Sequence, residues 1–434
     1  MLDKKTRSYS LISLGCARTL VDSEKMVDKL GKQGFKLVCE NTGESITVLN
    51  TCSFIQSAIE ETEQNIVDLS QKKQEGRIRY LAVVGCYPSR FKQSDLQKKY
   101  PLVDIWLSTQ ESQHLEKVLA DLVFQKKYAP SPLETPYIKL TPSHFAYIKI
   151  SEGCDNWCSF CTIPKIRGKH VSKSIDSILQ EITLQISCGA KELLLIAEDT
   201  TCWGEDLYGK PSLPTLLKEL TGLKVKWIRP MYLFPSRIDQ HFIQLLANHP
   251  TLFNYIDMPI QHSHTDILTA MGRGHNKQHL ENLLIAMKQA NPSLAIRTTV
   301  MVGFPGETEA HFEDLLDFIQ RYEFSHIGCF GYSEEKETRS SKLSSRVPSD
   351  VIQDRVKQVM EIQFKRVQSQ QKSRIGKSLE IVYEGNGLAR SYWEAPDVDS
   401  KIILINPGSL KVGQLAKATG IGTQGYDLLA EVAG

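Results

Sequence analysis

Three cysteines lie within eight residues, in the run Cys-Asp-Asn-Trp-Cys-Ser-Phe-Cys that contains Cys154, Cys158 and Cys161. No fourth cysteine stands nearby in the sequence, whereas a structural zinc site and an ordinary ferredoxin cluster each take four protein ligands. Three thiolates on a cluster of four irons leave one iron free to bind something small and reactive. The spacing therefore favours a 4Fe-4S cluster with an open coordination site.

The open iron suits chelation by the amino and carboxylate groups of S-adenosylmethionine (SAM), and the run is identified as the radical SAM motif. In that chemistry one electron from the cluster breaks a carbon–sulfur bond and releases a deoxyadenosyl radical, while the protein positions the cofactor. The alternative is a zinc knuckle completed by a distant Cys or His. Zinc loops usually carry close-spaced pairs of ligands, so the triplet disfavours zinc.

A second group of cysteines follows three strand-like runs, at residues 9–14, 46–50 and 80–84. Within two residues of these runs come Cys16, Cys52 and Cys86. Helical patterns separate the runs, as expected of a parallel α/β sheet, and the carboxyl ends of parallel strands share one ligand-binding edge. We therefore expect the three thiols to meet there and to hold a second cluster with an open iron. The alternative is that they are small buried core residues.

The elements that must position the triplet begin after a proline-rich stretch, 128–136 and 141–143, which is typical of a linker. Helical patterns separate nearly all of the strand-like runs that follow, at 145–150, 192–196, 226–231, 254–258, 295–302 and 326–332. Six βα repeats predict an incomplete, TIM-like barrel whose chemistry lies at the carboxyl-terminal face of the strands. The triplet directly follows the first strand and so belongs to that mouth.

Other polar or glycine-rich positions follow strands of the same barrel. Glu198 follows the second strand, and it either binds the amino group of the cofactor or serves as a helix cap or surface carboxylate. His262 follows the fourth, where a hydrogen-bonded structural role is favoured over substrate contact. Gly303 and Gly306 follow the fifth in a run that lacks the Lys-Ser/Thr of a phosphate loop. They would let the backbone approach an adenine, or would form a simple turn.

The last part of the chain changes pattern. Apolar residues at helical spacing over 350–368 predict a long amphipathic helix. Short branched-residue runs at 381–383, 402–405 and 415–418 then predict a small β-barrel. The expected fold is thus α/β, with an N-terminal parallel α/β domain at 5–125, a partial (βα)6 barrel at 138–370 and a C-terminal β-barrel at 372–434.

Composition sets limits on location and chemistry. The chain has 434 residues, a formal charge of +2 and 41% hydrophobic residues, which is ordinary for a soluble globular protein. Neither a signal-like start nor eighteen consecutive apolar residues is found, so a cytoplasmic protein without membrane contact is expected. Ten cysteines in a reducing compartment indicate metal or redox work rather than disulfides. The cysteines outside both groups are expected to be core or incidental thiols: Cys39, Cys188, Cys202 and Cys329.

Over its whole length the chain resembles the methylthiotransferase family of radical SAM enzymes. Three stretches resemble the RimO-type branch, which modifies a ribosomal protein, rather than the MiaB-type branch, which modifies an adenosine of transfer RNA. These stretches are Ser-Leu-Gly-Cys at 13–16 with Leu-Val-Asp-Ser-Glu at 20–24, Ile-Ser-Glu-Gly-Cys at 150–154, and Ala-Arg-Ser-Tyr at 389–392 with Ala-Pro-Asp-Val-Asp at 395–399. One departure is Ala17-Arg18-Thr19, where that branch usually has Pro-Lys-Asn.

The resemblance implies that Cys16, Cys52 and Cys86 hold an auxiliary 4Fe-4S cluster and that the triplet holds the radical SAM 4Fe-4S cluster. It also implies a C-terminal TRAM domain that recognises the substrate. The reaction would convert an aspartate of small-subunit ribosomal protein twelve to its 3-methylthio derivative, with SAM as the radical source and methyl donor. A flavodoxin-type or ferredoxin-type electron donor would be needed. The alternative is methylthiolation of a transfer RNA adenosine.

Charge in the C-terminal domain bears on that choice. Residues 372–434 contain seven Lys and Arg against seven Asp and Glu, so this domain is neutral. Proteins bind transfer RNA largely through a basic surface, so the neutral charge of this domain disfavours transfer RNA binding. We expect Glu394, Asp397 and Asp399 to form an acidic cluster that meets a basic ribosomal protein, although a run of charges is often only a solvated face.

Overall fold

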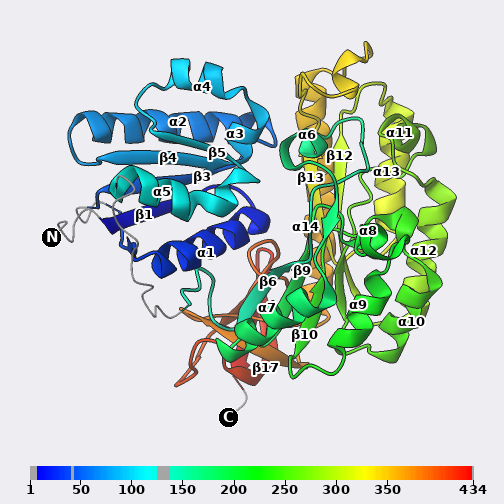
Figure 1. The fold of residues 1–434 in the computed structure, drawn as a ribbon. Coiled ribbons are helices and arrows are strands. Elements are labelled where there is room, and N and C mark those ends of the chain that lie inside the picture. Colours follow the sequence, from blue (N-terminus) through cyan, green and yellow to red (C-terminus); the bar gives the residue numbers. More distant parts are fainter. Residues whose placement is uncertain (1–6, 41–43, 125–136, 433–434) are drawn as a thin grey trace. The chain divides into compact units, whose positions relative to one another are not determined.

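A computed structural model describes residues 7–40, 44–124 and 137–432 (Figure 1). The described residues fall into two compact units. The first contains the chain up to residue 140 together with 152–155 and 161–169, and the second contains 141–151, 156–160 and the chain from 170 onward. The predicted linker at 128–136 lies outside the described residues. No helix in the described ranges is long and apolar enough to cross a membrane.

The first unit is built on a five-stranded parallel sheet in the order β2-β1-β3-β4-β5. Its strands are β1 (Ser8–Ser13), β2 (Lys36–Leu37), β3 (Ile46–Thr51), β4 (Tyr80–Gly85) and β5 (Ile105–Ser108). Every residue of β3 is buried, as expected of a parallel strand covered on both faces. The parallel α/β prediction is confirmed, although the sequence patterns did not reveal β2 and β5.

Helices cover both faces of this sheet: α1 (Ala17–Lys32), α2 (Gln56–Gln74), α3 (Cys86–Arg90), α4 (Gln93–Lys99) and α5 (Leu115–Phe124). One apolar core lies between the sheet and α1 and α5, and a second lies between the sheet and α2, α3 and α4 (Figure 1). A short helix from later in the chain, α6 (Ile163–Arg167), also belongs to this unit and packs on α3.

The second unit contains the predicted partial barrel. Its strands are β6 (Phe145–Lys149), β9 (Glu192–Ile196), β10 (Trp227–Pro230), β11 (Tyr255–Asp257), β12 (Ala295–Val302) and β13 (His326–Gly331). They form two parallel three-stranded sheets, β10-β9-β6 and β11-β12-β13. The backbone N–H of Leu233 donates to the carbonyl of Asp257, which links β10 to β11. All six strands lie within one residue of the predicted bounds.

Helices form the outer layer of this barrel (Figure 1). They are α7 (Ile175–Ser187), α8 (Glu205–Tyr208), α9 (Leu213–Leu220), α10 (Gln240–Asn248), α11 (Thr265–Ala270), α12 (Lys277–Ala290), α13 (Glu309–Arg321) and α14 (Ser349–Lys372). One continuous apolar core joins strands and helices, with residues such as Leu195, Ile256 and Phe312 fully buried in it. The short strands β7 (Ser151–Glu152) and β8 (Val171–Ser172) flank the cysteine triplet in the sequence.

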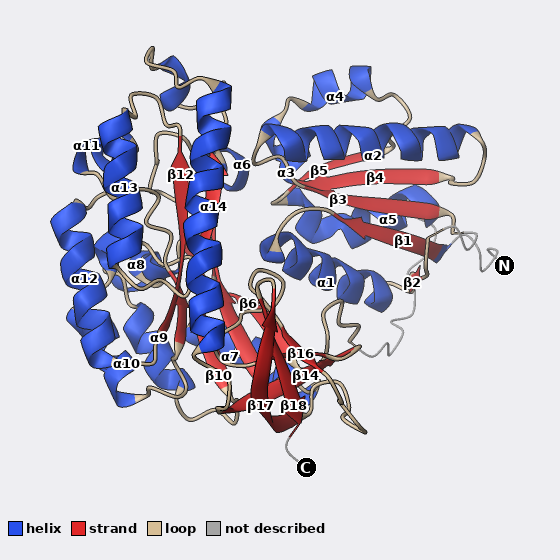
Figure 2. Cartoon of the chain, turned by 180° about the vertical axis from the view of Figure 1, so that it is seen from behind, coloured by secondary structure: helices blue, strands red, loops and turns tan. Residues whose placement is uncertain are grey.

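The C-terminal residues form the predicted closed β-barrel, in the order β14-β15-β16-β18-β17. Its strands, drawn in red in Figure 2, are β14 (Ser378–Gly385), β15 (Leu388–Arg390), β16 (Ile402–Leu404), β17 (Leu415–Gln424) and β18 (Asp427–Val432). The sequence patterns did not reveal β15 and β18. This small barrel belongs to the same compact unit as the partial (βα)6 barrel.

Buried ion pairs hold the small barrel to the larger one. Glu192, the first residue of β9, pairs with Arg229 of β10 and, at 2.9 Å, with Arg390 of β15. Tyr255, the first residue of β11, donates to a carboxylate oxygen of Asp399 at 2.6 Å. Since these partners lie at or near the amino-terminal ends of the strands, the small barrel closes the end of the larger barrel opposite to the predicted mouth.

The expected acidic cluster is therefore wrong. Glu394 is fully buried and pairs with Arg374 at 2.5 Å. The side chain of Asp399 is 1% exposed and lies 3.4 Å from Arg297. Asp397 alone of the three is exposed, and it accepts a hydrogen bond from Tyr147 at 3.0 Å. Two of the three carboxylates serve interior pairing and cannot meet a partner protein.

Candidate functional site

The three separated cysteines lie at the carboxyl edge of the parallel sheet in the first unit. Cys16 stands between β1 and α1, Cys52 directly follows β3, and Cys86 directly follows β4 and begins α3. A Cβ atom added to Gly15, at φ +101°, would lie 3.3 Å from Sγ of Cys52, so the loop before α1 touches the second thiol. A Cβ atom added to Gly85, at φ +99°, would clash with the side-chain oxygen of Asn50, so only glycine fits directly before Cys86.

Positive charge surrounds these thiols. Burial raises the pKa of Cys16, but the charges of Arg18 and Arg167 and hydrogen bonds from Thr19 outweigh it and hold that pKa at about 7. Burial raises the pKa of Cys86 to about 12. A metal would have to displace the proton of this thiol, as coordinating metals do.

The three thiols lie on neighbouring loops at one edge of the sheet, and the charges of Arg18 and Arg167 act on Cys16. A structural zinc site takes four protein ligands, whereas three thiolates on a cluster of four irons leave one iron open. Among the described residues, the group of three candidate ligands whose atoms lie within 4.8 Å of one another is His264, Asp266 and His311, which is separate from these thiols. Three thiols beside arginines fit a negatively charged iron–sulfur cluster.

The cysteine triplet begins and ends in the first unit. Cys154 is buried, and its backbone N–H donates to the carbonyl of Gly168 at 3.1 Å, which closes the base of the loop. A Cβ on Gly153, at φ +73°, would lie 2.0 Å from the carbonyl oxygen of Lys169, so the chain requires glycine before the first cysteine. At the other end, the N–H of Ile163 donates to Sγ of Cys161 at 3.4 Å. Such N–H···S bonds stabilise a thiolate.

The middle cysteine belongs to the second unit and lies beside an arginine that the sequence patterns did not reveal. Nη1 of Arg273 lies 3.4 Å from Sγ of Cys158, and Nη2 donates to the carbonyl of Pro259 at 2.9 Å. The guanidinium also lies 3.7 Å from the ring centroid of Phe234. These contacts fix a positive charge next to the thiol, where it would stabilise a thiolate if the sulfur bound a metal.

A buried carboxylate at the end of β9 fixes the loop between the first two cysteines of the triplet. Asp199 is 1% exposed and accepts hydrogen bonds from Asn156 at 2.7 Å and from Arg237 at 2.9 Å. Arg237 also donates to the side-chain oxygen of Asn156 at 2.5 Å. Glu198, the predicted cofactor residue, is the neighbour of Asp199 and is partly buried. Asn156 stands inside the triplet run, but no sequence pattern indicated its contacts with Asp199 and Arg237.

The glycine-rich turn after β12 has a clear packing role. The N–H of Gly303 donates to a carboxylate oxygen of Glu307 at 3.0 Å, and that carboxylate pairs with Arg355 of α14 at 2.6 Å. Gly306 is exposed, and its N–H donates to the carbonyl of Ser345 at 2.7 Å. His262 is fully buried and accepts the N–H of His264 at 2.9 Å, and burial lowers its pKa to about 3, as expected of a hydrogen-bonded structural histidine.

Gly303→Ala should destabilise the protein more than Gly306→Ala. Both residues have positive φ, at +78° and +91°, which costs an alanine about 1–2 kcal/mol. A Cβ at Gly303 would also lie 2.3 Å from Ile352, whereas nothing lies within 4 Å at Gly306. Overpacking adds about 1–3 kcal/mol, so urea unfolding should show a larger loss for Gly303→Ala, and Ile352→Ala should relieve the difference. Equal losses would exclude the packing role.

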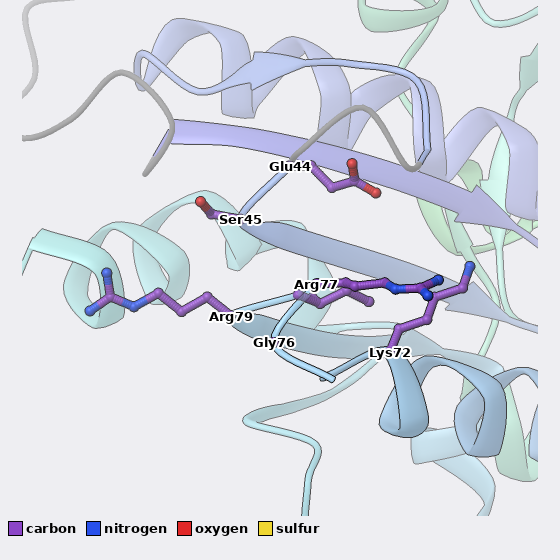
Figure 3. Close-up of a pocket in the computed structure, with 7 residues that line it drawn as sticks. Glu44, Ser45, Lys72, Gly76, Arg77 and Arg79 are labelled. Carbon is purple, nitrogen blue, oxygen red and sulfur yellow. The ribbon is translucent and has the colours of Figure 1, made fainter. Parts of the chain in front are cut away.

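A cavity of about 590 Å³ in the first unit lies at the other edge of the sheet (Figure 3). Its lining residues precede β3 and β4 or end α2: Glu44, Ser45, Lys72, Gly76, Arg77, Ile78 and Arg79. This is the amino-terminal edge of the strands, and no cysteine lines the cavity. It is therefore separate from the thiol site.

Comparison with known proteins places these features in a family. The Radical SAM superfamily model matches residues 148–319, Uncharacterized protein family UPF0004 matches 8–108, and the TRAM domain matches 375–433. The chain is 36% identical over 437 residues to "Ribosomal protein uS12 methylthiotransferase RimO" of Thermoanaerobacter sp. (strain X514), covering 98% of this chain and 100% of that protein. The chain belongs to the RimO family. The family predicted from the sequence is thus confirmed, and with it a radical SAM methylthiotransferase.

Further relatives agree with this assignment to the RimO family. The protein of the same name from Myxococcus xanthus (strain DK1622) is 37% identical over 438 residues, covering 98% of this chain and 92% of that protein. Among solved structures, the radical SAM methyltransferase TsrM from Kitasatospora setae matches with a TM-score of 0.57 and 10% identity, covering 77% of this chain and 74% of that one. That likeness supports the fold alone. The cofactors of the RimO family are SAM and 4Fe-4S clusters.

Proposed function

We propose that this chain methylthiolates an aspartate of small-subunit ribosomal protein twelve, forming 3-methylthioaspartate. The observation that carries the proposal is the similarity to proteins named uS12 methylthiotransferase over 98% of this chain and 100% of the first relative. The presence of both cysteine groups, each in a loop that suits a cluster, supports the same chemistry. Cys16, Cys52 and Cys86 would hold the auxiliary cluster, and Cys154, Cys158 and Cys161 the radical SAM cluster.

When bound, the two clusters and SAM supply a radical able to attack an unactivated carbon–hydrogen bond and a source of methylated sulfur. The chain's own residues hold and orient these groups. Arg273 keeps a positive charge against Cys158, and the Asp199 carboxylate holds Asn156 inside the triplet loop. We assign Glu198 to the amino group of SAM. Gly303 and Gly306 would let the backbone approach the adenine, with Gly306 as the exposed member of the pair.

We further propose three domains, at 5–125, 138–370 and 372–434, and a cytoplasmic reaction supplied with electrons by a flavodoxin-type or ferredoxin-type protein. The absence of a net charge from residues 372–434 supports a protein substrate rather than transfer RNA, because RNA binding gains much of its free energy from a basic surface. With the acidic cluster excluded, recognition of the ribosomal protein has to rest on other surfaces.

The test offers the reconstituted protein both substrates under anaerobic conditions with SAM and a reductant. We expect mass spectrometry to find a methylthio group in place of one hydrogen on an aspartate of ribosomal protein twelve, and no change in a transfer RNA anticodon stem-loop. Omitting SAM is the control. Modification of the RNA adenosine, or SAM cleavage without any change in the ribosomal protein, would contradict the proposal.

A further inference from the structure

Arg167, the last residue of α6, is a buried arginine of the first unit that contacts residues from three separate segments. Its side chain is 3% exposed. Nη2 donates to Sγ of Cys86 at 3.5 Å, while Nη1 lies 2.7 Å from Glu152 and 3.2 Å from Asp22. Cys86 begins α3, Glu152 stands two residues before Cys154, and Asp22 lies on α1. One guanidinium thus joins a thiol of the separated trio to the base of the triplet loop.

Other contacts hold this arrangement in place independently of Arg167. The residue after it, Gly168, accepts the N–H of Cys154 at 3.1 Å. Thr162, the residue before α6, donates to the carbonyl of Phe54 at 3.4 Å, and Thr109 donates to the carbonyl of Ile166 at the same distance. Because backbone contacts and the packing of α6 on α3 already fix the helix, the fold does not depend on the charge of Arg167 alone.

The charge of Arg167 acts on all three separated thiols. Burial raises the pKa of Cys52 and of Cys86, and the guanidinium opposes that rise in both, as it also favours the thiolate of Cys16. An arginine stays protonated in proteins, so its charge is permanent. Asp22 and Glu152 are only partly exposed, at 22% and 29%, and they partly neutralise it.

We infer that Arg167 is a positioning residue that raises the reduction potential of the auxiliary cluster and ties that cluster to the segment bearing Cys154 and Cys161. The inference rests on the proposed ligand role of Cys16, Cys52 and Cys86. Reduction adds negative charge to a cluster, and a hydrogen bond or a positive charge at a ligand sulfur stabilises the reduced form. Asp22 and Glu152 are negatively charged and pair with Arg167, so they oppose its effect on the reduction potential.

The test measures the midpoint potential of the auxiliary cluster in the full chain. Alanine at Cys154, Cys158 and Cys161 removes the other cluster, so all iron and all paramagnetic signal belong to the auxiliary site. In this background Arg167→Gln should lower the ratio of reduced to oxidised cluster about tenfold at a fixed solution potential. For a one-electron couple this is a shift of about 59 mV to more negative potential. Arg167→Lys, which keeps the charge, should retain most of the original value.

Asp22→Asn and Glu152→Gln provide the matched comparison, because they remove negative charges from the same guanidinium. Both should shift the potential in the positive direction, opposite to Arg167→Gln, whereas a general loosening of the site would move all variants the same way. If Arg167→Gln does not keep its cluster, the potentials of Asp22→Asn and Glu152→Gln still test the inference. The inference would be overturned if the midpoint potential shifted in the same direction in Arg167→Gln, Asp22→Asn and Glu152→Gln, or if it did not shift in any of them. If the background protein with native Arg167 binds no iron, the proposed ligand set fails instead.

Discussion

Replacing Cys16, Cys52 and Cys86 together with alanine should abolish methylthio transfer while SAM cleavage continues. These residues lie on the sheet edge of the first unit, whereas the proposed ligands of the cluster that forms the radical are Cys154, Cys158 and Cys161. Modified ribosomal protein should fall on the order of a thousandfold or more, as when one member of a functional group is removed. Iron content should fall from about eight to about four atoms per chain. Mass spectrometry of 5′-deoxyadenosine and of the ribosomal protein would measure both reactions.

The reciprocal variant separates this outcome from general loss of structure. Alanine at Cys154, Cys158 and Cys161 should remove both SAM cleavage and methylthio transfer while about four irons remain. Cys39→Ala, an exposed cysteine of the first unit outside both groups, should change neither reaction. If the variant lacking Cys16, Cys52 and Cys86 still modified the ribosomal protein, the auxiliary role of those residues would be excluded.

The positions of the six cysteines could be anticipated because each follows from a rule about neighbouring residues. Branched apolar runs bounded by glycine or proline marked the long strands, and the carboxyl ends of parallel strands share an edge. Gly85 illustrates this, since its positive φ ends β4 and turns the chain into Cys86. Strands β2 and β15 could not be predicted, because they have only two and three residues. So short a run shows no periodicity and forms a strand only through pairing with its neighbours.

Single charged residues with distant partners could not be anticipated. Arg167 contacts Cys86, which is 81 residues away in the sequence, and Arg273 contacts Cys158, which is 115 residues away. No local sequence pattern could predict either contact. The wrong expectation for Glu394 has the same origin. A carboxylate in a polar run looks solvated, but Arg374 pairs with it in the interior, and sequence pattern alone does not show which face of a loop is buried.

Glu192→Leu should lower the free energy of unfolding by about 3–5 kcal/mol, the usual loss when one partner of a buried ion pair is removed. The Glu192 side chain is 2% exposed and contacts two fully buried guanidiniums, Arg229 and Arg390. Burial raises its pKa, but those guanidiniums outweigh the burial and lower the pKa of the carboxyl below its ordinary value. Leucine would leave two like charges buried without their shared carboxylate. Urea unfolding at neutral pH would measure the loss.

A second ion pair between the same two barrels provides the matched control. Glu380 pairs with Lys226 at 2.6 Å, but its side chain is 60% exposed, so Glu380→Leu should cost less than about 1 kcal/mol. Adding Arg229→Leu to Glu192→Leu should recover part of the loss, because Arg229 has lost its carboxylate partner Glu192, whereas Arg390 keeps Glu384 at 2.6 Å. Similar losses for Glu192→Leu and Glu380→Leu would show that burial does not decide the contribution of these pairs. A larger loss for Glu192 alone would instead mean that the charged network holds the C-terminal barrel across the amino-terminal end of the strands.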